Sequence, residues 1–173
     1  MVSNDYVFTD DEKINSAINF YIKNKNTDLP IIIPGKNGSG KTHILKSFQN
    51  YYQTKNDSKT IYISAEAFKN EFIESIKKGT TDSFRKKYRN LDVLLIDDFE
   101  ILKKCDATLQ ELCFTFYELL NKKASVFIST TCTLSKGFIP KLKTLLKNSM
   151  TLYLPSNSKN QRFVKVVFYV RNK

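Results

Sequence analysis

The sequence predicts a three-layer α/β fold in which helices cover both faces of a five-stranded parallel sheet. Three observations support this prediction. Short apolar runs alternate with segments of helical periodicity, a glycine-rich motif follows the first run, and two aspartates follow the third. Because the carboxyl ends of parallel strands meet at one edge of a sheet, we expect the motif and the aspartates to form one site there.

The predicted strands are apolar runs without polar alternation, which is typical of parallel strands covered on both faces. They are residues 31–33, 60–63, 91–96, 126–128 and 151–154. Apolar residues at helical spacing predict a first helix that ends at about residue 25 and further helices after it. These further helices are expected at residues 43–52, 66–78, 83–88, 109–120 and 139–146. The segment 163–173 fits two interpretations, an extra strand or the stub of a lid domain.

The length of 173 residues suits one domain, which we expect to span residues 1–173. No apolar stretch approaches the roughly 20 residues needed to span a bilayer, and the N-terminus lacks the pattern of a secretory signal. We therefore expect a cytoplasmic protein without membrane contact. The three cysteines form no CxxC pair, so their spacing suggests neither a disulfide framework nor a zinc site.

The formal net charge of +11 suggests a polyanionic partner such as nucleic acid. The lysines are spread along much of the chain, however, and this distribution also fits solvated helix faces. Only the gathering of these charges on one face would separate the two interpretations.

The glycine-rich motif fits the phosphate-binding pattern GxxxxGK[ST] and lies between an apolar run and a helical segment. Its residues are Gly35, Lys36, Asn37, Gly38, Ser39, Gly40, Lys41 and Thr42. Glycines let the backbone N–H groups face the phosphates, and the helix N-terminus adds partial positive charge. Lys41 is then expected to reach the β and γ phosphates of ATP, and the Thr42 hydroxyl to bind Mg²⁺. The alternative is a glycine-rich turn that binds no ligand.

Asp97 and Asp98 stand at the end of the third apolar run. In nucleotide hydrolases, an acidic pair stands at the same place, at the end of a buried strand. Asp97 is expected to hold Mg²⁺, directly or through water. Asp98 is the candidate catalytic group that polarises an attacking water. The alternative is an acidic pair that caps the next helix.

Several segments together resemble the AAA+ core of the bacterial replication initiator DnaA and its shorter DnaA-like regulatory relatives. They are Gly38 to His43, Tyr62 to Phe68, Phe84 to Arg89, Asp92 to Asp98 and Phe114 to Leu120. The resemblance runs from about Tyr6 to Arg162. It implies binding of ATP or ADP, with slow hydrolysis that switches assembly or a partner. It also implies that the partner is an AAA+ replication protein or a second copy of the chain.

In DnaA-like initiators, the helices after the second strand include a motif that contacts single-stranded DNA. The matching stretch here is residues 72–89. The candidates are Ile73 as an apolar contact, and Lys77, Lys78, Arg85 and Lys87 as phosphate contacts. The alternative is that Ile73 and the adjacent Phe72 belong to the core.

The sequence departs from this family pattern at three places. Thr130-Thr131 stands where the family has the Ser-Asp that senses the γ-phosphate, so Thr131 is the candidate catalytic residue there, with a hydroxyl that can bond to a phosphate or water but brings no charge. Leu145 stands at the arginine-finger position and cannot donate a hydrogen bond, although Lys141 or Lys147 could substitute as point charges. The sequence also stops where the lid, its sensor arginine and the duplex-binding domain would follow, so we expect the lid to be absent or vestigial.

Three hypotheses remain. The first is a DnaA-like ATP-binding protein that acts in replication initiation or its regulation, with weak or partner-dependent hydrolysis. The second is a helicase-loader ATPase of the DnaC and IstB kind. The third is a hydrolysis-deficient adaptor, which Leu145 favours and which the retained Lys41, Thr42, Asp97 and Asp98 oppose.

Overall fold

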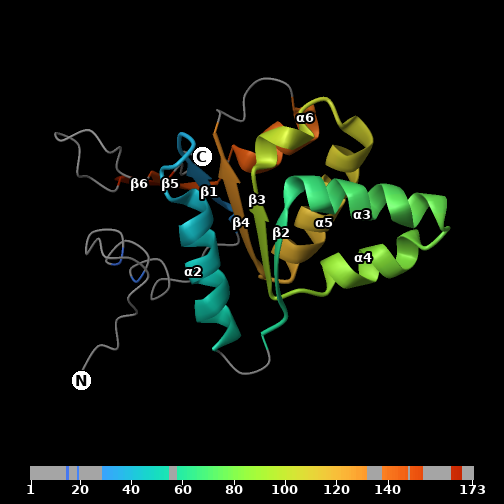
Figure 1. Cartoon of the computed structure of the whole chain (residues 1–173), viewed down its shortest axis with the longest axis horizontal. Coiled ribbons are helices and arrows are strands. Elements are labelled where there is room, and N and C mark those ends of the chain that lie inside the picture. The colour runs from blue at the N-terminus through green and yellow to red at the C-terminus, as the bar shows by residue number, and fades with distance from the viewer. Residues whose placement is uncertain are drawn as a thin grey trace.

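The computed structural model describes residues 15, 19, 29–54, 58–131, 138–147, 149–153 and 165–168. The strands are β1 (Ile31–Pro34), β2 (Thr60–Ser64), β3 (Val93–Asp97), β4 (Ser125–Thr130), β5 (Met150–Tyr153) and β6 (Lys165–Phe168). The helices are α2 (Lys41–Gln53), α3 (Ala65–Lys77), α4 (Thr81–Arg89), the 3-10 helix η1 (Phe99–Leu102), α5 (Asp106–Asn121) and α6 (Pro140–Leu146). Figure 1 shows α2 on one side of the sheet and the later helices on the other, which confirms the three-layer α/β fold.

Within this part of the chain, the strands form one six-stranded sheet in the order β2-β3-β4-β1-β5-β6. The five predicted strands are present and pair in parallel, with β1 between β4 and β5, and β3 between β4 and β2. β6 lies in the segment that had two interpretations, and it pairs antiparallel with β5. The sheet therefore contains the expected parallel strands and one antiparallel edge strand.

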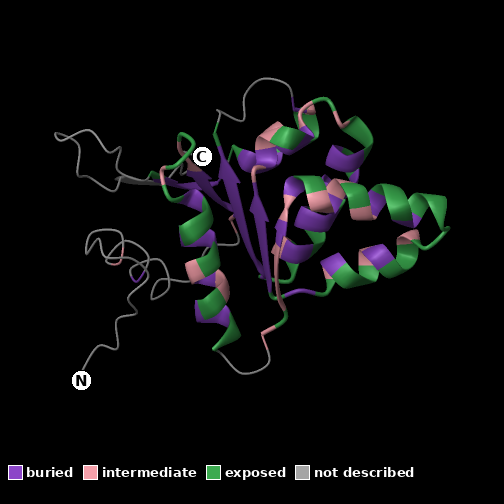
Figure 2. Cartoon of the chain, in the orientation of Figure 1, coloured by how far each residue is buried: buried purple, intermediate pink, exposed green. Residues whose placement is uncertain are grey.

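The sheet separates two apolar cores because successive strand residues point to opposite faces. Ile31 and Ile33 of β1 pack on the α2 face, in the same cluster as Phe48 of that helix. Ile32 belongs to the larger core beneath α3, α4, η1, α5 and α6. Figure 2 shows that the central strands are almost wholly buried, whereas the helices are buried along one side.

The helices predicted after the glycine motif are present, with small shifts at their ends. α3 begins at an N-cap serine, because the Ser64 hydroxyl accepts a hydrogen bond from the Ala67 N–H at 3.1 Å. Most of the predicted first helix lies outside the described residues, although Asn15 and Asn19 are both helical. Among the helices that are described, none is long and apolar enough to cross a membrane.

Candidate functional site

The glycine motif and the aspartate pair lie at the same edge of the sheet. β4 is the strand between β1, which leads into the motif, and β3, which ends in Asp97. The Gly35 N–H donates to the Thr130 carbonyl at 2.9 Å, so the start of the motif is attached to the end of β4. Ligands of open parallel α/β sheets bind at this edge.

The backbone of the phosphate loop, residues 35–42, is shaped to hold an anion. Gly38 and Gly40 have φ angles of 77° and 90°, which residues with a Cβ atom rarely adopt. Gly40 is the N-cap of α2, whose first turn contains no acidic residue that would compensate the helix dipole. The Ser39 hydroxyl oxygen is buried and has no hydrogen-bond partner among the described residues. A phosphate oxygen is a suitable acceptor for this hydroxyl.

Lys41 begins α2 and lies inside the loop, with 5% of its surface exposed. Its ammonium group donates to the carbonyl oxygens of Gly35 and Lys36 at 2.8 and 2.9 Å. A buried ammonium group requires such partners, because desolvation of an unpaired charge is very unfavourable. The loop therefore holds a full positive charge beside the partial positive charge of the helix N-terminus.

Asp97 is 2% exposed and accepts hydrogen bonds on both carboxylate oxygens. The hydroxyls of Thr42 and Tyr62 each donate to Oδ2 at 2.7 Å. The Ser129 hydroxyl and the Asp98 N–H donate to Oδ1. Burial alone would raise the pKa of Asp97, but these hydrogen bonds outweigh it and hold the pKa below its ordinary value. Asp97 is therefore an oriented carboxylate at neutral pH.

Tyr62 and Ser129 are site residues that the sequence analysis missed. They come from β2 and β4, the two strands that flank β3, close to the carboxyl ends of those strands. Burial, and then the hydrogen bond to Asp97, raise the pKa of Tyr62, so its hydroxyl keeps its proton and remains a donor. The available signal was their position at strand ends, which becomes informative only once the strand order is known.

Thr42 and Asp97 have the donor chemistry that Mg²⁺ requires. Magnesium prefers oxygen ligands, and nucleotide sites supply one or two from the protein, with phosphates and waters completing the shell. The Thr42 hydroxyl comes from the first turn of α2 and the Asp97 carboxylate from the end of β3, and their oxygens lie 2.7 Å apart. The described residues contain no group of three or more His, Cys, Asp or Glu that could hold a metal ion by themselves.

Asp98 adopts a left-handed backbone conformation directly after β3, with φ 54° and ψ 47°. Its N–H donates to the Ser129 hydroxyl at 3.0 Å, which holds this uncommon conformation in place. Its pKa is raised, first by burial and then by the negative charges of Asp97 and Glu100, while Lys41 acts in the opposite direction. A raised pKa makes a carboxylate a better proton acceptor, as a general base requires.

Thr131 follows β4, and its hydroxyl is bound to a carboxylate that the sequence analysis missed. This hydroxyl donates to Glu100 Oε1 at 2.6 Å, and the Thr131 N–H donates to Oε2 at 3.1 Å. The Thr130 side chain makes a further hydrogen bond to Glu100. Burial alone would raise the pKa of Glu100, but these bonds outweigh it and lower the pKa. The position of Glu100, two residues after Asp98, was the sequence signal that could have revealed this residue.

The candidate DNA contacts lie on α3 and α4 and have different surroundings. Ile73 is 40% exposed, whereas Phe72 is buried, so the core interpretation holds for Phe72 alone. Lys77 is exposed and forms no ion pair within the described part of the chain. The other three have carboxylate partners, as Lys78 pairs with Glu74, Arg85 with Glu111 and Lys87 with Glu71.

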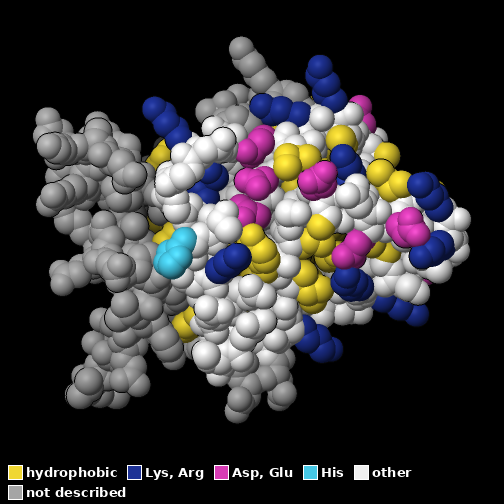
Figure 3. Space-filling view, viewed as in Figure 1, with side chains coloured by type: hydrophobic (Ala, Val, Ile, Leu, Met, Phe, Trp, Pro, Cys, Tyr) yellow, Lys and Arg dark blue, Asp and Glu magenta, His cyan; other side chains and the backbone are white. Residues whose placement is uncertain are grey.

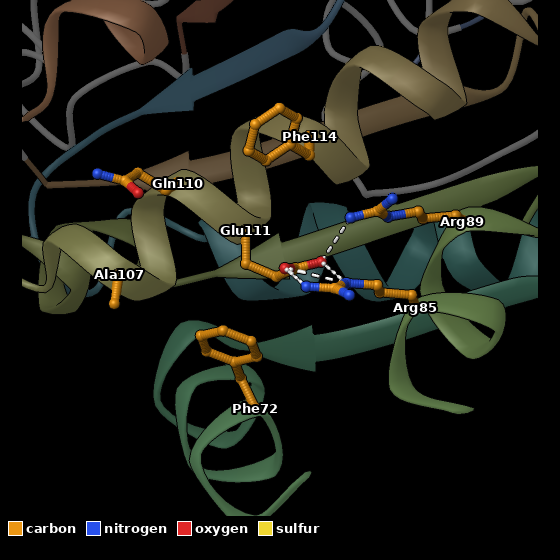
Figure 4. Close-up of a pocket in the computed structure, with 7 residues that line it drawn as sticks. All are labelled: Phe72, Arg85, Arg89, Ala107, Gln110, Glu111 and Phe114. Carbon is orange, nitrogen blue, oxygen red and sulfur yellow. Dashed lines mark hydrogen bonds and ion pairs between the residues drawn. The ribbon is translucent and has the colours of Figure 1, made fainter. Parts of the chain in front are cut away.

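A cavity of about 490 Å³ opens between α3, α4 and α5. Figure 4 shows Arg85 and Arg89 reaching from α4 to the carboxylate of Glu111 on α5, with Phe72 and Phe114 at opposite sides. Glu111 is 5% exposed and accepts hydrogen bonds from Arg85 at 3.1 Å and Arg89 at 2.6 Å. A buried carboxylate needs such partners, so this network ties α4 to α5 and already engages Arg85.

Basic side chains do not gather in one groove on the face shown in Figure 3. Lys and Arg side chains there are interspersed with Asp and Glu. The ion pairs of α3 and α4 follow the same pattern. On this face, the charge distribution therefore agrees with solvated helix surfaces, and a DNA contact here has to rest on individual residues.

Leu145, at the expected arginine-finger position, lies in α6 with only 9% of its surface exposed. It packs in the core with Leu142 and Leu146. Lys141, one of the proposed substitutes, lies over the ring of Phe114 at 4.0 Å. Lys147, the other, is exposed at the end of the helix. Position 145 thus faces the interior of the described fold.

A phosphate loop between β1 and α2, together with an acidic end of β3 on this sheet, defines the P-loop class of nucleotide-binding folds. The family described as the bacterial DnaA ATPase domain matches residues 4–154. The chain belongs to this family.

Solved structures share this architecture. Domain III of the Thermotoga maritima replication initiation protein DnaA is 29% identical, with a TM-score of 0.77 over 91% of this chain and 70% of that one. A replication initiator DnaA bound to AMPPCP and single-stranded DNA is 24% identical, with a TM-score of 0.78 over 88% and 49%. The DnaC helicase loader shares the fold at 17% identity, with a TM-score of 0.64 over 83% and 89%. The chain spans about half the length of the longer initiator chains that it matches.

Proposed function

We propose that the chain binds ATP with Mg²⁺ and acts as a nucleotide-dependent switch in bacterial replication initiation or its regulation. The observation that carries this proposal is the contact at 2.7 Å between the Thr42 hydroxyl and the Asp97 carboxylate, next to the buried Lys41. A glycine-rich turn without a ligand has no need for a buried ammonium group and a buried carboxylate beside it. The family match supports the same proposal.

In this proposal the loop binds the phosphates through its backbone N–H groups and the N-terminus of α2. The unpartnered Ser39 hydroxyl donates to one of the phosphate oxygens. Lys41 exchanges its two loop carbonyls for the β and γ phosphates, which are stronger partners because they are charged.

Thr42 and Asp97 hold the magnesium ion, with Tyr62 and Ser129 keeping the Asp97 carboxylate oriented. When bound, Mg²⁺ neutralises charge that develops on the β and γ phosphates. Asp98 accepts a proton from the attacking water, a role that fits its raised pKa.

Hydrolysis is expected to be weak in the isolated chain. Arginine fingers contribute on the order of 10³ to 10⁵ in rate, and Leu145 is buried at the position where the family carries one. An AAA+ partner that supplies an arginine would then complete the site. The same observation favours a second candidate function, an adaptor that binds nucleotide without hydrolysing it. A helicase-loader role is a further alternative, supported by a shared fold.

A contact with single-stranded DNA is a separate part of this proposal. Ile73 and Lys77 lie one helical turn apart on α3, and both are exposed. They present an apolar group and a positive charge on one helix face, a combination that suits a single strand. A solved initiator with this fold was bound to single-stranded DNA.

Titration with a fluorescent ATP analogue and Mg²⁺ tests nucleotide binding. We expect saturable binding by the wild type, loss of binding in Lys41→Ala, and no change in Lys86→Ala, which removes an exposed lysine from α4. Equal binding by wild type and Lys41→Ala would contradict the proposed site.

Hydrolysis assays with and without an AAA+ partner separate the switch from the adaptor. Turnover that rises with the partner, and that depends on an arginine of the partner, supports the switch. Binding without turnover under either condition supports the adaptor. Recovery of a replicative helicase in a pull-down, with no initiator, would favour the loader.

A further inference from the structure

Glu100 brings another fixed carboxylate to the nucleotide edge of the sheet. It lies in η1, directly after the aspartate pair, and both of its oxygens are bound to the end of β4. Thr131 donates through its hydroxyl and its N–H at 2.6 and 3.1 Å, and Thr130 adds a side-chain hydrogen bond. A free glutamate side chain samples many rotamers, so these bonds hold the carboxylate in one place.

These bonds determine what Thr131 can offer to a nucleotide. A threonine hydroxyl has one hydrogen to donate. In Thr131 that hydrogen is donated to Glu100. Phosphate oxygens of ATP accept hydrogen bonds and do not donate them, so the lone pairs left on the Thr131 hydroxyl cannot bond to the γ-phosphate. The Glu100 carboxylate has further lone pairs, and it is an acceptor suited to water.

The end of β4 is the middle of the site. Its neighbours are β1, which leads into the phosphate loop, and β3, which carries the aspartates. The Thr130 carbonyl accepts from Gly35 of the loop at 2.9 Å, and the Ser129 hydroxyl accepts from the Asp98 N–H at 3.0 Å. Asp98 is the N-cap of η1, the short helix that contains Glu100, so the two carboxylates come from the same turn of the chain.

We propose that Glu100 is a catalytic residue that accepts a hydrogen bond from the water attacking the γ-phosphate and orients this water together with Asp98. The inference rests on the proposed binding of ATP in the loop. During hydrolysis the water oxygen forms a bond to the γ-phosphorus while the bond from phosphorus to the β,γ-bridging oxygen breaks. ADP leaves with that electron pair. One water proton passes to Asp98 and then to the released phosphate, and the other stays hydrogen-bonded to Glu100.

Removal of the Glu100 charge should have opposite effects on binding and on turnover. A carboxylate near the γ-phosphate repels bound ATP, so Glu100→Gln should leave ATP affinity unchanged or make it tighter. A correctly oriented water lowers the barrier to attack, so the same change should slow hydrolysis. A residue with a purely structural role would instead lower affinity and turnover together.

The test compares Glu100→Gln and Thr131→Val with the wild type in the full chain. Glu118→Gln removes an exposed carboxylate from α5 and is the matched control. The measurements are affinity for a fluorescent ATP analogue with Mg²⁺ and single-turnover hydrolysis with protein in excess. We expect Glu100→Gln to slow turnover at least about tenfold without loss of affinity. Thr131→Val should have a smaller effect, because the N–H bond to Glu100 remains.

The complex of ADP with aluminium fluoride gives a second readout, because it imitates the attacked phosphoryl group with water in line. We expect Glu100→Gln to weaken this complex at least about tenfold while ADP affinity is retained. Three results would overturn the inference: turnover of Glu100→Gln within about twofold of the wild type, parallel loss of affinity and turnover, or no aluminium fluoride complex in the wild type. A wild type that binds no ATP analogue would refute the nucleotide site itself, and the wild-type titration alone reveals this.

Discussion

The hydroxyl of Thr42 and the carboxylate of Asp97 are joined by a hydrogen bond of 2.7 Å, although the two residues lie 55 positions apart. Thr42 lies in the first turn of α2, and Asp97 ends β3. The packing of α2 against the sheet therefore brings the two proposed magnesium ligands together before any metal binds. Such preorganisation reduces the cost of ordering the site when a ligand arrives.

We expect Asp97→Asn to remove most of the Mg²⁺ dependence of nucleotide binding. The amide keeps the shape of the carboxylate but loses its charge, so the gain in analogue affinity from Mg²⁺ should fall by about 10 to 100-fold. Affinity in EDTA should be unchanged or slightly tighter, because one fewer negative charge faces the phosphates. Asp82→Asn, an exposed change on α4, is the control. A wild-type Mg²⁺ response in Asp97→Asn would show that Asp97 does not hold the metal.

The parts of the site that could be predicted are those with a local sequence pattern. The loop follows a known spacing, and Asp97 ends an apolar run, so both are recognisable without a structure. Strand order brings Tyr62 and Ser129 to Asp97, because β2 and β4 flank β3. The path of the chain after β3 brings Glu100 to the end of β4. No local sequence pattern predicts that β2 and β4 flank β3, so Tyr62 and Ser129 cannot be recognised from the sequence alone. Glu100 has only its position two residues after Asp98 as a signal.

The elements of the fold that could be predicted also have a local sequence pattern. The parallel strands appear as apolar runs because both of their faces are covered. The 3-10 helix η1, Phe99–Leu102, is too short to show periodicity, although it positions Glu100. The composition of segment 163–173 does not reveal that β6 pairs with β5, because this pairing depends on another part of the chain.

We expect Glu111→Gln to lower stability near neutral pH. Burial alone would raise the pKa of Glu111, but the hydrogen bonds from Arg85 and Arg89 outweigh it and lower the pKa. The stabilisation is therefore present above the unfolded pKa of about 4.3 and is lost as the pH falls through the lower folded pKa. Because Arg85 is 41% exposed, we expect a loss of about 2–3 kcal/mol, below that of a fully buried pair.

Urea denaturation of the wild type and Glu111→Gln, from about pH 7 to about pH 3, measures this effect. The difference in unfolding free energy should be largest near neutral pH and should shrink as the pH falls below about 4. Glu118→Gln should differ little from the wild type throughout this range. A difference for Glu111→Gln that does not vary with pH would indicate a packing effect and not a charge effect.

We expect Lys77→Ala to weaken binding of single-stranded DNA and to reduce the slope of log affinity against log salt by about 0.7. Ile73→Ser should weaken binding with little change in the salt slope, because an apolar contact releases no counterions. Fluorescence anisotropy of a labelled oligothymidylate at several salt concentrations measures both effects. Lys46→Ala is the control, since α2 lies on the opposite side of the sheet from α3 (Figure 1). Equal losses from Lys46→Ala and Lys77→Ala would indicate non-specific attraction by net charge.

We expect Leu145→Arg to destabilise the fold and not to restore an arginine finger. Leu145 is 9% exposed and packs in the core, so an arginine there would bury an unpaired charge at a cost of about 3 kcal/mol or more. Thr144→Arg, at the exposed neighbouring position, should change stability by no more than about 0.5 kcal/mol. Urea denaturation measures the stability, and hydrolysis at increasing protein concentration measures any action between subunits. The contrary result is a Leu145→Arg variant with wild-type stability and with turnover that rises with protein concentration. It would mean that α6 turns position 145 outward in an assembly. The buried leucine would then no longer explain weak hydrolysis.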